Sequence, residues 1–205
     1  MLAIKRQFGK LLLDGLLIVF SVLFALYINR LSENAKMAGK KSVAMERLKK
    51  ELLKNEAIIE IWYDEHSTIR DKITKVVENE QDSLRIQLLQ YEYLNLGVLT
   101  GDKSLIEAVL TDVSWEAAKA TDIIAELDYE LVEKLTHAYT MQQHLIDDTL
   151  KKILDLYFDQ SSHDMTNFDP IMRQYQLRFF ELAGQEALLK HLYQTAINEL
   201  DKQSL

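Results

Sequence analysis

The sequence predicts an all-α protein, in which an N-terminal transmembrane helix continues into a long amphipathic helix and a helical bundle. The 205 residues include one proline and six glycines, and 48% are hydrophobic and 27% charged, a composition that favours helices. An apolar run covers residues 11–28. We expect three regions: a membrane anchor with a basic tail (1–30), a juxtamembrane amphipathic helix (31–80) and a helical body that packs on it (81–205).

The apolar run predicts the membrane anchor. Fifteen of its 18 positions are hydrophobic, and no Lys or Arg lies between Lys10 and Arg30. At about 1.5 Å per helical residue it spans roughly 27 Å, which approaches a hydrocarbon thickness of about 30 Å. Tyr27 and Arg30 follow as an interfacial aromatic and a snorkelling cation. A signal peptide and a buried core helix are the alternatives, but the run exceeds a signal core of about 7–15 residues and no small-residue cleavage site follows.

Three polar or small residues within the run support hypotheses about the membrane. Asp14 lies four residues after Lys10, so the two side chains share a helix face and can pair. This carboxylate is either an interfacial group that snorkels or a polar contact in an oligomeric bundle, an ion path or a proton path. Ser21 and Ala25 form a step of small residues that permits close approach of a second helix.

Charge is distributed unevenly along the chain. Residues 1–41 carry a net +5, and since the chain totals −8, residues 42–205 carry −13. The basic collar suits anionic lipid headgroups, whereas phosphate would repel the acidic body, so we expect a lipid bilayer and no nucleic acid among the partners.

Location and compartment follow from the flanking charges and from the absence of cysteine. More Lys and Arg follow the run than precede it, which favours a cytoplasmic body, although a basic N-terminal tail resists translocation. We expect a single-pass protein of a bacterial inner (cytoplasmic) membrane. The chain has no cysteine, which excludes disulfides and thiolate sites.

A heptad-like seam follows the anchor without a Gly/Pro-rich linker. Its members are spaced alternately by three and four residues over four heptads, and they include one Asn and one His. They are Met45, Leu48, Leu52, Asn55, Ile59, Trp62, His66, Ile69, Ile73 and Val76. Two alternatives stay open: a long amphipathic helix that packs within its own chain, and a coiled coil between chains.

The remaining segments alternate between polar breaks and helical patterns. Loops are predicted at 79–83 and 161–169. Helices are predicted at 86–99, ended by Thr100-Gly101-Asp102; after a Ser104/Glu107 capping box; at 115–120 with Ser114 as cap; from Asp128 to about 157; and at 171–201 after Asp169-Pro170. Gly184 is a predicted kink or interruption of the last helix.

No catalytic pattern is present in the sequence. Phosphate-binding Gly loops and a G-x-S-x-G elbow are absent, and the paired His around Glu of metalloproteases is missing, so we predict no enzyme, no cofactor and no metal site. His66 is either a hydrogen-bonded core residue or a pH-sensitive element. Trp115 is either an aromatic anchor between helices or part of a ligand pocket with Lys119, His137 and Tyr139.

Several short segments together carry a resemblance. They are Asp14, Ala25, Asn29-Arg30, Glu33, Leu48–Asn55, Ser114–Lys119 and Ala138-Tyr139. On these residues the chain, up to about residue 145, resembles a family of uncharacterised bacterial single-pass membrane proteins with a C-terminal helical domain. It departs from the pattern at Leu31, where Trp is common, and at Asp122, where Gly often follows Thr. The resemblance implies architecture and membrane location, and it implies no activity.

The sequence therefore favours a membrane-anchored scaffold or assembly subunit, which forms a homo-oligomer through the run and the seam and docks a protein partner. The alternative is a membrane-embedded sensor or effector, whose helical body binds a ligand or stress signal and alters the membrane. Asp14, the small-residue step and His66 motivate that alternative.

Overall fold

The computed structural model describes residues 2–78 and 82–203, with side chains described in residues 15–78 and 83–203. These residues form helices and irregular segments, and no strand occurs among them, so the all-α class is confirmed. The chain divides into two compact units, Met1–Ala44 and Met45–Leu205, and each is described by itself.

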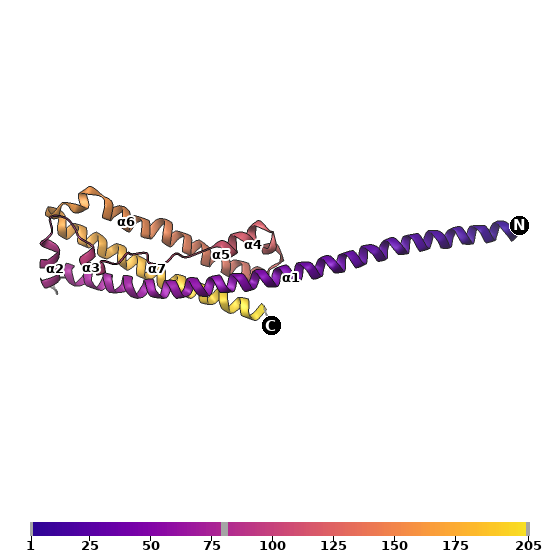
Figure 1. Cartoon of the computed structure of the whole chain (residues 1–205), viewed down its shortest axis with the longest axis horizontal. Helices are drawn as coiled ribbons and strands as arrows, with labels where there is room; N and C mark the ends of the chain where they lie inside the picture. Colours follow the sequence, from indigo (N-terminus) through magenta and orange to yellow (C-terminus); the bar gives the residue numbers. More distant parts are fainter. Residues whose placement is uncertain (1, 79–81, 204–205) are drawn as a thin grey trace. The chain divides into compact units, whose positions relative to one another are not determined.

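Seven α-helices are assigned within the described ranges (Figure 1): α1 (Leu2–Val77), α2 (Asp82–Leu89), α3 (Gly97–Thr100), α4 (Val113–Ala120), α5 (Tyr129–His144), α6 (Lys151–Phe158) and α7 (Phe168–Gln203). Four short helical turns accompany them: η1 (Ile123–Glu126), the π-helical η2 (Leu145–Leu150), η3 (Gln160–His163) and η4 (Met165–Asn167).

The first unit consists of the beginning of α1. Every large apolar side chain from Leu16 to Ile28 is 49–67% exposed. The Ser21 hydroxyl donates to the Leu17 carbonyl at 2.7 Å, so its polar atom is satisfied inside the helix. Asp14 and Lys10 have no described side chains, and their predicted pairing lies outside the described residues.

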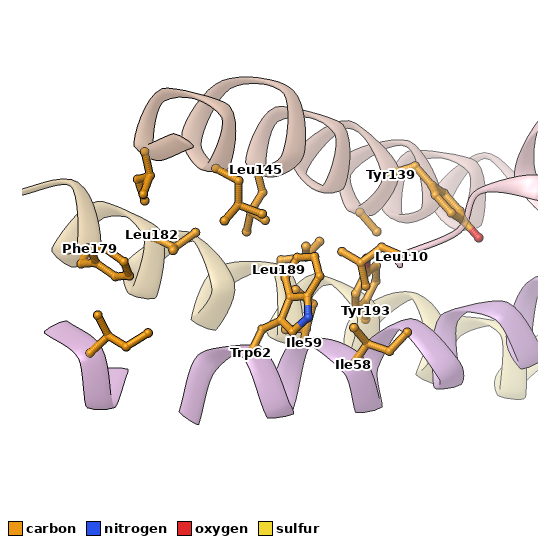
Figure 2. Close-up of a cluster of buried hydrophobic side chains, with 14 of the residues drawn as sticks. Ile58, Ile59, Trp62, Leu110, Tyr139, Leu145, Phe179, Leu182, Leu189 and Tyr193 are labelled. Carbon is orange, nitrogen blue, oxygen red and sulfur yellow. The ribbon is translucent and has the colours of Figure 1, made fainter. Parts of the chain in front are cut away.

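The second unit is built on three long helical segments around one core. The later part of α1, the α5–η2–α6 segment and α7 run alongside one another (Figure 1). Two side-chain bonds show that α1 and α7 are antiparallel: Lys190 to Glu60 at 2.8 Å and Gln194 to Glu56 at 2.8 Å. Apolar side chains of all three segments, such as Trp62, Leu145 and Leu189, converge between them (Figure 2).

The predicted seam lies inside this core. All ten seam residues, Leu48, Leu52, Asn55, Ile59, Trp62, His66 and Ile69 among them, are at most 7% exposed. The alternative of packing within one chain is therefore confirmed, and a coiled coil between chains through these residues is wrong. A face already buried by its own bundle leaves nothing for a second chain to cover.

The region between α1 and α4 differs from the prediction. The helix expected at 86–99 is two short helices, α2 and α3, with residues 90–96 between them. No helix follows the Ser104/Glu107 pair; Ser104 instead bonds locally with the backbone of Ile106, which is a turn contact and not a cap. Residues 99–114, named the strap below, run from the end of α3 to the start of α4.

The first residues of three helices can be compared with the sequence prediction, which is confirmed for α5 and wrong for α4 and α7. Asp128 caps α5, because its carboxylate accepts from the Glu130 amide at 2.9 Å. Ser114 is not a cap, since α4 begins at Val113 after Asp112. The last helix begins at Phe168, with Pro170 in its first turn, and α7 continues through Gly184 without interruption.

The helix predicted from Asp128 to residue 157 contains a wide turn at η2. Along α5, buried residues follow the intervals four, three, four at Leu131, Leu135, Ala138 and Gln142. After Leu145 and Thr149 the stripe continues at Leu150 and Ile153, one residue later than that pattern requires. The π-helical turn accommodates this extra residue and keeps the apolar stripe facing the core.

Candidate functional site

The candidate membrane segment lies in the first unit. An 18-residue window of its helix has a mean hydropathy of 1.8 and no part of it is buried by the rest of the chain, so it is long and apolar enough to cross a bilayer. Ser21, Ala25, Tyr27 and Arg30 are all exposed along it.

In the second unit, polar residues of α1 satisfy the backbone of the strap. Asn55 is fully buried, and its amide donates to the Thr111 carbonyl at 2.6 Å while its oxygen accepts from the Thr111 N–H at 3.0 Å. Buried backbone groups outside helices need such partners, because no neighbouring turn supplies them. The presence of Asn55 in an otherwise apolar seam is therefore explained by the irregular strap that this residue faces.

Three further side chains of α1 hold the strap in the same way. His66 Nε2 lies 2.9 Å from the Leu105 carbonyl, the Lys72 ammonium donates to the Leu99 carbonyl at 2.7 Å, and the Glu51 carboxylate accepts from the Ser114 N–H at 2.9 Å. The order of these partners shows that the strap runs antiparallel to α1. The side chains of α1 thus fix the register of the strap, which has no regular structure between the end of α3 at Thr100 and the start of α4 at Val113.

This polar network continues across the core to α5 and α7. Gln142 Oε1 accepts from Asn55 at 3.1 Å and from the Tyr193 hydroxyl at 2.6 Å, and the Tyr139 hydroxyl donates to Glu51 at 2.7 Å. Burial raises the pKa of Tyr139 and of Tyr193 well above the usual value, so both phenols remain neutral donors. The network ties three helical segments together through satisfied polar groups.

The second polar contact of His66 is an acid. His66 Nδ1 lies 2.5 Å from Glu186 Oε1, and both side chains are at most 1% exposed. The Leu105 carbonyl only accepts, so Nε2 carries a hydrogen, and one further proton is shared between Nδ1 and Glu186. Burial raises the pKa of the Glu186 carboxyl, and the imidazole opposes this shift. Glu186 Oε2 has no hydrogen-bond partner among the described residues, which favours the neutral carboxyl.

The structure brings together three of the four residues predicted for a pocket. Trp115 stacks on Tyr139 with ring centroids 5.2 Å apart and planes 7° apart, and Lys119 Nζ lies 5.5 Å from the Trp115 centroid. All three line a cavity of about 360 Å³. His137 is exposed on α5 and does not line this cavity, so its assignment to the pocket is wrong: it lies two residues before Tyr139, about 200° away around the helix axis.

A second cluster, which the sequence did not predict, joins rings from two distant segments. Ring centroids lie 6.0 Å apart for Tyr91 and Tyr93, 6.1 Å for Tyr93 and His163, 5.6 Å for His163 and Tyr157, and 5.2 Å for Tyr157 and Phe158. The aromatic pairs at 91/93 and 157/158 are the only signal in the sequence, and their separation conceals that they meet.

Among the described residues, no three His, Cys, Asp or Glu side chains are placed to hold a metal ion. Comparisons with known proteins found no matching family model, no similar curated protein and no similar solved structure.

Proposed function

We propose that this chain is a single-pass membrane protein whose helical body is a non-enzymatic docking module, either a scaffold or an assembly subunit. The observation that carries the proposal is the row of eleven large apolar side chains from Leu16 to Ile28, each about half exposed or more. Burying each such side chain contributes about 1.5–3 kcal/mol, so a bilayer would stabilise this segment strongly.

The construction of the body supports a binding role. Its core joins three helical segments, and its buried polar groups hold the strap in one register. Partners of such a module recognise a fixed surface, since little conformational entropy is lost on binding. The acidic charge of residues 42–205 favours a protein partner over nucleic acid.

Location and assembly complete the proposal. The basic side chains that follow the span, such as Arg30 and Lys36, favour a cytoplasmic body at a bacterial inner membrane. Homo-oligomers would form through the span, where Ser21 and Ala25 permit close helix packing, and not through the buried seam.

Membrane fractionation of the full-length protein tests the anchor. We expect the wild type to remain in the membrane pellet after alkaline carbonate extraction. Replacing Leu17 and Phe24 together by Arg adds a cost of about 2.5–3.5 kcal/mol per charge near the centre of a span and should release the protein. Val43→Arg is the matched control, because Val43 is 48% exposed on the same helix beyond the run. Release of the wild type, or equal release of both variants, would refute the anchor.

Topology and assembly have separate tests. Because the chain has no cysteine, single replacements Lys5→Cys and Ser42→Cys can report the side of the membrane through an impermeant maleimide. Mass measurement in detergent, with Ala25→Leu beside the wild type, tests oligomerisation through the span. A monomeric wild type would remove the homo-oligomer from the proposal.

A sensor or effector is the second candidate function. The buried Glu186 carboxyl, which lies 2.5 Å from His66, favours it, since the protonation of a carboxyl within a core is coupled to the packing around it. Overexpression that leaves the membrane potential unchanged between pH 5 and pH 8 would speak against this function.

A further inference from the structure

The second unit carries an aromatic surface formed by the exposed rings of Tyr91, Tyr93 and Phe158 and the half-buried rings of Tyr157 and His163. Each ring contacts the next in an unbroken series, so segments about 65 residues apart in sequence share one patch. Tyr91, Tyr93 and Phe158 are 38%, 49% and 75% exposed. Clustered tyrosine and phenylalanine rings are typical of the centres of protein interfaces, where they supply most of the binding energy.

The two segments that form this surface contain several carboxylates, and they contain no Lys or Arg. Residues 86–102 contain Glu92 and Asp102 but no Lys or Arg, and residues 153–172 contain four Asp and no Lys or Arg. Glu92 lies between the two tyrosines, Asp159 follows Phe158, and Asp164 follows His163. The surface therefore combines aromatic rings with a negative field.

The charges of Asp159 and Asp164 persist at neutral pH. The hydroxyl and N–H of Ser161 lower the pKa of Asp159, and those of Thr166 lower the pKa of Asp164. Neither carboxylate forms an ion pair with a Lys or Arg among the described residues. By contrast, Asp155 and Asp169 are paired with Lys151 and Arg85.

A hollow adjoins the aromatic surface. A cavity of about 330 Å³ is lined by Tyr157, Phe158 and Leu154 on one side and by Asp102 and Lys103 of the strap on the other. The Lys103 ammonium donates to Glu65 at 2.8 Å, so its charge is compensated. A partner side chain that enters this hollow passes an aromatic wall and meets a carboxylate.

We propose that the aromatic surface binds an arginine-bearing segment of a partner protein. This inference rests on the proposed docking function and names the chemistry of the partner. A guanidinium is planar, stacks on exposed rings and donates two parallel hydrogen bonds to a carboxylate, so it matches both components of the surface. A lysine ammonium matches the charge but lacks the stacking plane and the paired donors.

Peptide binding to the full-length protein in nanodiscs of uncharged phosphatidylcholine tests the proposal. The probes are fluorescent hexa-arginine and hexa-lysine amides, measured by anisotropy. We expect the arginine peptide to bind about tenfold tighter than the lysine peptide, and Tyr93→Ala with Phe158→Ala to weaken it about tenfold. Tyr129→Ala is the matched control, because Tyr129 is 82% exposed on α5 and is not part of the aromatic series. It should change binding less than twofold.

Two further variants separate the components of the surface. Tyr93→Phe keeps the ring and should keep the preference for arginine, which distinguishes lost stacking from lost folding. Asp159→Asn with Asp164→Asn should weaken both peptides, because it removes charge and keeps the rings.

Several results would overturn the proposal. They are equal binding of the two peptides, equal loss in Tyr129→Ala and in the ring variant, or dimers in the nanodisc that depend on Tyr93 and Phe158 while neither peptide binds. The last result would assign the surface to a second copy of the chain. None of these results alters the outcome of carbonate extraction, so failure here is distinguishable from failure of the membrane anchor.

Discussion

His66 on α1 and Glu186 on α7 meet across the core with 2.5 Å between Nδ1 and Oε1, and both side chains are buried. Because the Leu105 carbonyl fixes the hydrogen on Nε2, the contact to Glu186 holds one proton. This pair joins α1, α7 and the strap at one point. The contribution of this pair to stability comes mainly from the hydrogen bond that the shared proton makes. An ion pair would contribute less, since buried charges carry a large desolvation cost.

Replacing Glu186 by Gln should be nearly neutral. The amide can donate to Nδ1 as the protonated carboxyl does, so we expect a change in unfolding free energy below about 1 kcal/mol. Glu186→Ala leaves Nδ1 without a partner in a buried cavity and should cost about 3 kcal/mol or more. Denaturant unfolding of the detergent-solubilised chain, followed by near-UV circular dichroism, measures both. A large loss in Glu186→Gln would show that the pair is ionic.

The same carboxyl predicts a pH dependence. Burial raises the folded-state pKa of Glu186 above its ordinary value of 4.5. The stability that it contributes is therefore fully present below about pH 4.5 and is lost as the pH rises through the folded-state pKa. Relative to the wild type, Glu186→Gln should become more stable as the pH increases from 4 to 8. Parallel stability curves for the two proteins would contradict the raised pKa.

Asn55→Ala should be among the most destabilising polar substitutions. It leaves the N–H and C=O of Thr111 without their side-chain partner and leaves the side-chain oxygen of Gln142 with the Tyr193 hydroxyl alone, at a cost of about 2–4 kcal/mol. Asn198→Ala, at an exposed position of α7, should change stability by less than about 0.5 kcal/mol. Hydrogen exchange should accelerate at the Thr111 amide in the first variant alone. Unchanged exchange there would mean that the strap does not depend on Asn55.

Alanine substitution should destabilise the protein at one predicted capping position, Asp128, and have little effect at the other, Ser114. Asp128→Ala removes the acceptor of the Glu130 amide and should cost about 1 kcal/mol. Ser114→Ala should cost less than about 0.5 kcal/mol, because α4 uses the backbone N–H of Ser114 and not its hydroxyl. Thermal unfolding of the two variants under identical conditions compares them. A larger loss of stability in Ser114→Ala than in Asp128→Ala would show that the Ser114 hydroxyl does cap α4, as the sequence suggests.

Periodic apolar patterns predicted the fold well, because burial of a helix face repeats along the chain. The seam from Met45 to Val76 and the cap at Asp128 follow from local rules. The strap could not be predicted in this way. Its backbone is satisfied by Asn55 and His66, which lie about 40–55 residues earlier, and no local signal encodes such partners. The same limit concealed the meeting of Tyr93 and His163.

The wide turn at η2 has a consequence for the far end of α6. In a uniform α-helix the extra residue would advance everything after it by about 100° around the helix axis, and the wide turn cancels this advance. Tyr157 and Phe158 lie seven and eight residues beyond Leu150, the last residue of the turn, so the direction in which they project depends on Leu145–Leu150 as well as on their own positions. Forcing that turn into α-helical geometry without removing a residue would rotate the ring of Tyr157 away from His163, whereas deleting one residue as well should keep it on the same side of the helix. An irregularity of backbone winding inside the protein thus aims a side chain on its outside.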